Sequence, residues 1–408
     1  MISTIVVVGG GQAGAQAIDT LRREGFTGRL LLIGDEPELP YQRPPLSKKY
    51  LSGELTADRL PFRHRAFYEE HRVELRLGLQ AVALDPGARR VELADGEVLS
   101  YDRLLLALGS SVRRLICPGA DLPGVHYLRT VADVMLIRAA IKPGRRAVII
   151  GGGYIGLETA ATCRYMGCEV TVLELADRVM NRVVAPCVSQ FFEQEHRAQG
   201  IHISCNTRVT RLEGAGCVEH VVCADGSKVA ADLVIVGVGA IATTALASAA
   251  GLACDNGIIV DEYCRTSDEA IFAAGDCCNH PSLRFGRRVR IESVDNAFEQ
   301  AKSAAFNLLD RKIAHDRVPW FWSDQYDCKL LIAGLSEDYD RQVLRGDPAT
   351  RSFSVCYLKG SELIAVEAVN HSKDYMAGRK LIAERAQMNL AKLANPDLAI
   401  KDAVAELA

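Results

Sequence analysis

The stretch IVVVGGGQAG, from Ile5 to Gly14, decides the fold of this chain of 408 residues. A β-branched run that ends in glycine is typical of a buried parallel strand. Gly9, Gly11 and Gly14 then follow with GxGxxG spacing, and a helical pattern continues through Leu21. In such a turn the first glycine permits the tight bend, the second lets the backbone approach a pyrophosphate, and the third lets helix and strand pack closely. The stretch predicts a dinucleotide site with the phosphates at the helix N-terminus.

A second strand, RLLLIGDE from Arg29 to Glu36, follows this helix. It brings Asp35 to a position about 20 residues beyond Gly14, where a carboxylate can bind a ribose hydroxyl. Glycine spacing alone also occurs in purely structural turns. Strand, glycines, helix, second strand and acid in this order favour a dinucleotide site.

The same unit recurs in the middle of the chain. AVIIGGG precedes a second helical pattern, and Gly151, Gly153 and Gly156 repeat the spacing. Glu158 lies on the helix, and the next strand, EVTVLE, ends at Glu174.

The acid at the end of this second unit bears on the choice of nucleotide. A carboxylate bonds a 2′-hydroxyl and repels a 2′-phosphate, so Glu174 favours NADH over NADPH. Arg178 and Arg182 follow closely, and an arginine can accommodate a 2′-phosphate. We still expect NADH. Two complete units indicate two bound dinucleotides, and the common reason is hydride transfer from a nicotinamide to a flavin.

Composition narrows the class of protein. The net charge of −3 gives no nucleic-acid footprint, and the length predicts two or three domains. The 13 cysteines are an odd number in a long chain, which favours reduced thiols in a cytoplasm. They include no CxxC pair, and we therefore predict no metal site. No signal peptide is visible.

The uncharged stretch Leu233–Leu252 has the length of a membrane span, but it is rich in glycine and alanine and reads better as strand, glycine turn and short helix. We expect no membrane association.

Three further motifs, each an apolar strand-like run that ends in glycine, occur in a fixed order with the two glycine turns. They are YDRLLLALGS (Tyr101–Ser110), ADLVIVGVGA (Ala231–Ala240) and TSDEAIFAAGDC (Thr266–Cys277). With the two glycine turns they resemble the two-dinucleotide flavoprotein disulfide-reductase superfamily. The resemblance implies an α/β, glutathione-reductase-like fold with two Rossmann-like domains, the first binding FAD and the second the nicotinamide nucleotide.

The expected domain boundaries follow from this order. An FAD-binding domain would comprise residues 1–111 and 240–313, and an NAD-binding domain residues 112–239. Residues 314–408 would form a C-terminal α+β domain, because KLLIAGL, VLRG and FSVCYLKGSELIAVEAV read as antiparallel strands with a hairpin at Lys359-Gly360. The segment RKLIAERAQMNLAKL then reads as helix.

Three motifs narrow the resemblance: YQRPPLSKKYL (Tyr41–Leu51), RIESVDNAFEQA (Arg290–Ala301) and PWFWSDQYD (Pro319–Asp327). They resemble NADH-dependent ferredoxin reductases of bacterial oxygenase systems, of the putidaredoxin reductase and biphenyl dioxygenase reductase type. The resemblance covers essentially the whole chain. One departure is LALGS, where the family usually has ATG, and we expect it to leave binding intact.

The disulfide-reductase branch of the superfamily is disfavoured by the cysteine positions. Those enzymes carry a CxxxxC pair in the helix after the acidic strand, whereas this chain has RPPLSKKYL there and no cysteine from Met1 to Ile116. Cys163 and Cys168 have the spacing, but they lie in the second unit and read as helix packing.

The resemblance also assigns roles to individual residues. Lys48 would approach the flavin N5 and favour the reduced ring, and Glu158 would pair with Lys48 and contact the nicotinamide. The expected FAD contacts are Gly9, Gly11, Ala13, Gly14, Asp35, Arg43, Lys48, Ala81, Arg129, Asp276, Val294 and Trp322. The expected NAD contacts are Gly151, Gly153, Tyr154, Ile155, Gly156, Glu158, Glu174, Arg182 and Gly239.

The electron acceptor is expected to be another protein, because the chain has no cysteine run for a cluster of its own. The resemblance implies a [2Fe-2S] ferredoxin that serves a Rieske oxygenase or a cytochrome P450 in aromatic hydrocarbon catabolism, with the reductase a monomer or homodimer. Arg43, Arg63, Arg65, Arg379 and Lys380 are candidates for docking, although each could equally be ordinary surface charge. Two alternatives stay open: a rubredoxin reductase, which shares every motif, and a redox-sensing flavoprotein like apoptosis-inducing factor.

Overall fold

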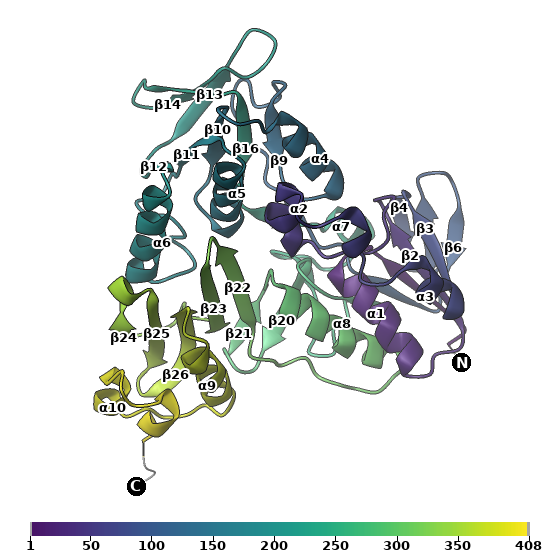
Figure 1. Ribbon diagram of the computed structural model, residues 1–408. Coiled ribbons are helices and arrows are strands. Elements are labelled where there is room, and N and C mark those ends of the chain that lie inside the picture. Colours follow the sequence, from purple (N-terminus) through teal and green to yellow (C-terminus); the bar gives the residue numbers. More distant parts are fainter. Residues whose placement is uncertain (1, 406–408) are drawn as a thin grey trace. The chain divides into compact units, whose positions relative to one another are not determined.

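Five parallel strands form the centre of the first of two units in the computed structural model, which describes residues 2–405 (Figure 1). The first unit contains the chain up to Gln42, Ala57–Ser111 and Ile241–Pro319, and the second contains Arg43–Thr56, Val112–Ala240 and the chain from Trp320 onward. The strand order is β19-β7-β1-β2-β3, that is Ile271–Ala273, Arg103–Leu106, Thr4–Val8, Arg29–Gly34 and Val73–Leu77.

The central strand β1 is buried on both faces, which explains its unbroken apolar run. Ile5 and Val7 pack into one core, with helices α1 (Gln12–Arg23) and α8 (Val294–Leu308). Val6 and Val8 point to the opposite core. That core includes residues of α7 (Ala245–Ala249) and of the antiparallel strands β4 (Ala81–Asp85), β5 (Arg90–Leu93) and β6 (Val98–Ser100).

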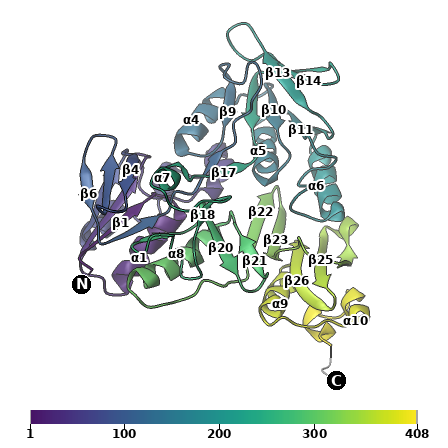
Figure 2. The same ribbon diagram turned by 180° about the vertical axis from the view of Figure 1, so that it is seen from behind.

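The remaining elements of the first unit are short. They are a 3-10 turn at Ala57–Arg59, α3 (Arg65–Glu70) and the small sheet of β18 (Ile258–Ile259), β20 (Cys278–Ser282) and β21 (Arg287–Val289), seen from behind in Figure 2. The short strands β8 (Ser110–Val112) and β17 (Ala240–Ala242) are paired, and each contains one of the several points at which the chain passes from one unit to the other.

The second unit repeats the parallel arrangement, in the order β12-β11-β10-β16-β9. These strands are His202–Ser204, Glu169–Leu173, Arg146–Ile150, Leu233–Val236 and Val125–Tyr127. Three helices accompany them, α4 (Val131–Ala140), α5 (Tyr154–Tyr165) and α6 (Pro186–Ala198). The unit also contains the antiparallel strands β13 (Val209–Glu213), β14 (His220–Cys223) and β15 (Lys228–Ala230), a 3-10 turn at Pro44–Ser47, and α2 (Lys49–Ser52).

A five-stranded antiparallel sheet forms the last part of the second unit, in the order β22-β23-β26-β25-β24. Its strands are Trp320–Gln325, Cys328–Gly334, Glu362–Val369, Ser352–Lys359 and Arg341–Asp347. Helix α9 (Ser372–Ala383) lies against β26 and β23, and a 3-10 turn at Pro348–Thr350, α10 (Leu390–Ala394) and a 3-10 turn at Ile400–Ala403 complete it. Strand β22 is not among the strands that the sequence predicts. The single helix predicted for Arg379–Leu393 is wrong in detail, because α9 begins at Ser372 and ends at Ala383, and a separate helix, α10, begins at Leu390.

The predicted α/β fold class is confirmed, with two Rossmann-like parallel sheets and a C-terminal α+β part. The uncharged stretch Leu233–Leu252 contains β16, the glycine turn and α7, as expected, and also the short strand β17, which was not predicted. Among residues 2–405, no helix combines the length and hydrophobicity needed to cross a bilayer. The three-domain boundaries stay a prediction; Arg43–Thr56 groups with the second unit rather than with the first.

Candidate active site

The first glycine turn has the geometry that the spacing predicts. Gly9 has φ of +120°, and a Cβ built there would lie 2.1 Å from the carbonyl oxygen of Ala107, which directly follows the neighbouring strand β7. A Cβ on Gly14 would lie 1.9 Å from the carbonyl oxygen of Gly9. At Gly11 it would meet no atom within 4 Å, and α1 has no side-chain N-cap. The turn is therefore a cradle of backbone N–H groups into which any side chain at Gly11 would intrude, which suits a pyrophosphate.

The AAGD segment lies against this turn. A Cβ on Gly275, whose φ is +89°, would lie 3.2 Å from the Cβ of Ala13 in the first turn of α1. The Gly275 N–H donates to Gln300 Oε1 of α8 at 2.8 Å. The neighbouring Asp276 carboxylate accepts a 2.9 Å hydrogen bond from the Ser110 hydroxyl. The fold thus brings Asp276 to the start of α1, where a carboxylate can bond the hydroxyls of a flavin side chain.

The second glycine turn repeats the first. Gly151 has φ of +107°, and its Cβ would lie 2.4 Å from the Gly237 carbonyl oxygen. A Cβ on Gly156 would lie 2.1 Å from the carbonyl oxygen of Gly151, whereas at Gly153 it would meet nothing within 4 Å. Gly153 is the N-cap of α5, again without a side-chain cap. Both turns therefore fit a dinucleotide phosphate.

Glu174 lies at the carboxyl end of β11, facing the second turn. Its carboxylate accepts hydrogen bonds from the N–H of Gly152 at 2.5 Å and of Ala176 at 2.8 Å. Arg178 is bound to the carbonyl oxygens of Val184 and Asn181 in its own loop. The exposed Arg182 lies beside Gly239, since a Cβ on that glycine would be 3.8 Å from Arg182 Nη2.

Lys48 and Glu158 form the ion pair that the resemblance implies. Lys48 Nζ lies 2.6 Å from Glu158 Oε2, and the two side chains are only 20% and 5% exposed. Two hydroxyls complete the shell of the carboxylate: Ser47 donates to Oε2 at 2.6 Å and Ser323 to Oε1 at 2.7 Å. Thr162 Oγ1 donates to the Ser47 carbonyl at 2.8 Å and fixes the segment that carries Lys48. A buried charge pair with its remaining acceptors satisfied is well compensated.

Aromatic rings link the second glycine turn to strand β22. The ring of Tyr154, at the start of α5, lies 4.6 Å from the ring of Phe321. Trp322 lies between Phe321, at 6.4 Å, and Trp320, at 5.4 Å. This places Trp322 in the same unit as Lys48 and Glu158.

The predicted FAD residues divide between the units. Gly9, Gly11, Ala13, Gly14, Asp35, Ala81, Asp276 and Val294 lie in the first unit, and Arg43, Lys48, Arg129 and Trp322 in the second. Within the first, Asp35 is exposed just after β2, Ala81 begins β4 and Val294 begins α8. Within the second, Arg43 Nη1 donates to the Arg129 carbonyl at 2.7 Å. The predicted NAD residues all lie in the second unit, and Ile155 is half-exposed on α5.

Sequence reasoning missed the two serines that bind Glu158. Ser47 adjoins Lys48 in RPPLSK and Ser323 lies in PWFWSD, so both motifs contained them. The structure adds that their hydroxyls point to one carboxylate.

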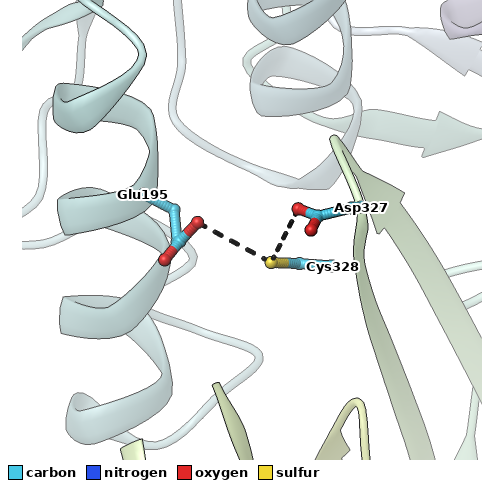
Figure 3. Close-up of side chains that lie close together, drawn as sticks. All are labelled: Glu195, Asp327 and Cys328. Carbon is cyan, nitrogen blue, oxygen red and sulfur yellow. Dashed lines mark hydrogen bonds between the residues drawn. The ribbon is translucent and has the colours of Figure 1, made fainter. Parts of the chain in front are cut away.

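One other group of side chains has the composition of a metal site (Figure 3). Glu195, Asp327 and Cys328 place a carboxylate oxygen each and a sulfur within 4.8 Å of one another. Arg351 Nη2 lies among them, 2.9 Å from Glu195 Oε2, 2.5 Å from Asp327 Oδ1 and 3.0 Å from Cys328 Sγ. Burial raises the pKa of the Cys328 thiol to about 11, which disfavours the thiolate that metals bind. The guanidinium supplies the positive charge that this cluster requires.

The docking candidates differ in their environments. Arg63 is bound to Asp19 at 3.0 Å and lies 5.3 Å from the ring of Phe67. Arg65 is exposed at the start of α3. Arg379 lies 5.5 Å from the ring of Trp320, and Lys380 is exposed beside it on α9.

Comparison with known proteins agrees with this arrangement. The family described as pyridine nucleotide-disulphide oxidoreductase matches residues 3–301, and a reductase C-terminal family matches residues 320–404. The chain belongs to the pyridine nucleotide-disulphide oxidoreductase family. It is 44% identical to the 5,5'-dehydrodivanillate O-demethylase ferredoxin reductase subunit of Sphingobium sp., covering 98% of each chain. It is 39% identical to a rubredoxin-NAD(+) reductase of Pseudomonas putida, covering 90% of this chain and 96% of that one.

A solved structure of this family also matches. The covalent putidaredoxin reductase–putidaredoxin complex has a chain that is 42% identical, with a TM-score of 0.95 and coverage of 98% of this chain and 97% of that one. The resemblance stated from the sequence motifs is therefore confirmed. FAD and NAD(H) are the cofactors that the family and these relatives imply for the chain, as predicted.

Proposed function

We propose that this oxidoreductase takes a hydride from NADH onto FAD and passes the electrons singly to a [2Fe-2S] ferredoxin. FAD supplies the exchange between two-electron and one-electron chemistry. Each NADH gives two electrons, two ferredoxins take one each, and one proton is released. The partner is an iron–sulfur ferredoxin, and we extend the proposal to a Rieske oxygenase or cytochrome P450 beyond it, in a cytoplasmic system that degrades aromatic compounds. We expect the reductase itself to be a monomer or homodimer.

The observation that carries the proposal is the ion pair of Lys48 and Glu158. In the segment where disulfide reductases hold a reactive cysteine pair, this chain holds a lysine, and its partner is a glutamate from the helix of the second glycine turn. A pair of this kind has no thiol to carry electrons. It can position a positive charge where a reduced flavin would develop negative charge, which is what direct hydride transfer requires.

Different residues would bind the two cofactors and stabilise the reduced flavin. The first glycine turn and Asp276 would hold FAD, and the second glycine turn with Glu174 and Arg182 would hold NADH. Lys48 would stabilise the reduced ring, and Glu158 would orient Lys48. None of these steps needs an acid or base of matched pKa, because hydride transfer depends mainly on position and field.

The test is an anaerobic half-reaction experiment. The FAD-loaded protein is reduced with one equivalent of NADH and then mixed with an oxidised [2Fe-2S] ferredoxin or, separately, with a rubredoxin. Fast reoxidation by the ferredoxin alone is the expected result. Reoxidation by rubredoxin alone would show that the electron acceptor is a rubredoxin and not a ferredoxin, in keeping with the similarity to a rubredoxin reductase. A reduced complex that persists with both would favour the redox-sensing alternative.

A further inference from the structure

A buried chain of hydrogen bonds starts at Glu158 and runs away from Lys48. Ser323 Oγ lies 2.7 Å from Glu158 Oε1, and Gln325 Nε2 lies 3.2 Å from Ser323 Oγ. Gln325 Oε1 lies 2.8 Å from His196 Nε2, and the Tyr326 hydroxyl lies 3.3 Å from His196 Nδ1. All of these residues belong to the second unit, on α5, on β22 and the residue after it, and on α6, which Figure 1 shows.

The residues of this hydrogen-bond chain are shielded from water. Ser323 and His196 are completely buried, Gln325 is 1% exposed and Glu158 is 4% exposed. Burial lowers the pKa of His196 to about 4, so its imidazole is neutral at physiological pH. A neutral imidazole has one donor and one acceptor nitrogen, so its tautomer is set by its neighbours.

The direction of every hydrogen bond follows from the charge on Glu158. A carboxylate paired with Lys48 can only accept, so Ser323 must donate to it. The Ser323 oxygen then accepts from the amide N–H of Gln325, which turns the Gln325 carbonyl toward His196. His196 must therefore carry its proton on Nε2, and Nδ1 accepts from the hydroxyl of Tyr326. Every donor in the chain points toward the Glu158 carboxylate.

We propose that Ser323, Gln325 and His196 are positioning residues for hydride transfer, which act through Glu158 on Lys48. Ser323 supplies the donor on Oε1, while Lys48 and Ser47 occupy Oε2. His196 holds the Gln325 amide in the orientation that leaves the Ser323 hydrogen for Glu158. This hydrogen-bond chain orients the Glu158 carboxylate. It does not conduct protons, because the Gln325 amide does not exchange protons readily. This inference rests on the proposed hydride transfer from NADH to FAD.

Loss of His196 has a specific consequence. In His196→Phe the buried Gln325 carbonyl loses its donor, and a turn of the amide lets it accept from Ser323 instead. The serine hydrogen is then drawn away from Glu158. His196→Phe should therefore have part of the effect of Ser323→Ala although residue 196 lies on α6 and Ser323 on β22, and it should have no further effect once Ser323 is alanine.

The experiment is anaerobic stopped-flow reduction of the FAD-loaded protein by NADH, without ferredoxin. We expect the limiting rate to fall about tenfold in Ser323→Ala, about fivefold in His196→Phe, and no more than about tenfold in the double variant, because the two act through one bond. The NADH dissociation constant should stay within about twofold, because the dinucleotide is held by the glycine turn.

Ser189→Ala is the matched control. Ser189 is completely buried on the same helix and donates to the Val179 carbonyl at 2.5 Å, outside the chain. It should lower thermal stability and leave the limiting rate unchanged. If His196→Phe does not fold, Gln325→Leu replaces it, with the same expected lack of additivity.

The outcomes separate the two claims. Multiplicative effects in the double variant, or limiting rates equal to wild type in the single variants, would overturn the positioning role and leave the reductase proposal intact. Failure of NADH to reduce the wild-type flavin would overturn the proposed function itself.

Discussion

At the residue scale, Lys48 is the side chain on which the proposed hydride transfer depends most directly. Lys48→Met removes the charge that would stabilise reduced flavin, so we expect the limiting rate of flavin reduction by NADH to fall about a hundredfold. FAD content should not change. Stopped-flow flavin absorbance measures the rate, and Lys49→Met, at the exposed neighbouring position, is the control. Normal reduction kinetics would remove Lys48 from the mechanism.

Because Lys48 is paired with Glu158, the thermal stability of the Lys48 variant is a second informative measurement. Lys48→Met leaves Glu158 without its cation in a site where the glutamate side chain is 5% exposed, which should also lower the thermal midpoint. Adding Glu158→Gln removes the unpaired charge. The double variant should regain stability but not rate, which separates the structural effect of Lys48 from its effect on the flavin.

Glu174 is expected to set the preference for NADH. Its carboxylate faces the second glycine turn, and a 2′-phosphate brought there would be repelled. Glu174→Gln should lower the ratio of kcat/KM for NADH to that for NADPH by about tenfold. Glu169→Gln, at the opposite end of the same strand, is the control. An unchanged ratio would place the discrimination elsewhere, with Arg182 the next residue to test.

What the sequence could predict about the site depended on distance along the chain. The glycines could be predicted because their roles are local: each Cβ would clash with a neighbouring carbonyl or fill the phosphate cradle. The hydroxyls on Glu158 could not, because Ser47 and Ser323 are 111 and 165 residues away from it. Only tertiary structure aligns donors over such separations.

At the element scale, the buried parallel strands were readable and the C-terminal elements were less so. β1 and β10 are continuous apolar runs, whereas β22 mixes aromatic and polar residues because it carries Ser323 and Gln325 inward. Helix α9 begins earlier than its apolar pattern suggests. Gly378, unusual in a helix interior, is required there because its Cβ would lie 2.7 Å from Val366 on β26.

A buried ion pair fixes β24 to the elements that follow the sheet. Arg345 Nε lies 2.9 Å from Asp374 Oδ2, with side chains 2% and 6% exposed, and Arg345 also donates to the carbonyls of Leu393, Asn395 and Leu398. Arg345→Ala removes the guanidinium that pairs with the buried Asp374 side chain, so we expect a loss of about 3–5 kcal/mol in the free energy of unfolding.

Chemical denaturation measures this loss. Lys380→Ala provides the comparison on α9, because Lys380 and Glu384 are both well exposed and 3.8 Å apart, and such a pair contributes about 0.5 kcal/mol or less. Equal effects of the two substitutions would contradict the importance assigned to the buried pair.

Glu367 on β26 makes stability depend on pH. Burial raises its pKa to about 7, although the Ala185 N–H at 3.0 Å and the Tyr357 hydroxyl at 2.7 Å favour its charged form. A folded-state pKa above the unfolded value gives stability that is complete below about pH 4.5 and is lost as pH rises through about 7.

Glu367→Gln should remove this dependence, because an amide resembles the protonated acid and can still accept from Ala185 and donate to Tyr357. We expect the variant to gain up to about 3 kcal/mol over wild type above pH 7 and little or nothing near pH 4.5. Thermal melts across this range test it. A difference that does not change with pH would show that Glu367 is not the titrating group.

At the scale of the whole molecule, the charge of the local docking surface matters more for binding a partner than the net charge of the protein. The resemblance implies an acidic ferredoxin, which the net charge of −3 would weakly repel, so attraction would require a local basic surface. The charge of Arg63 is offset by the nearly buried Asp19 at 3.0 Å, whereas Lys380 faces only the exposed Glu384 at 3.8 Å, a looser pair that water screens. Arg379 and Lys380 are adjacent cations on α9, and Arg379 lies over the ring of Trp320. These two are the stronger candidates for ferredoxin docking.

Charge reversal on α9 tests this choice. Lys380→Glu should raise the KM for ferredoxin about fivefold to tenfold at low ionic strength and flatten its dependence on salt, because the steering interaction is screened within about 10 Å at ordinary salt. Flavin reduction by NADH should be unaffected, since it does not involve the partner. Arg65→Glu on α3 of the first unit is the matched reversal and should change neither quantity. If Arg65→Glu alone raises the KM, the ferredoxin docks on the first unit instead, and the cations of α9 are ordinary surface charge.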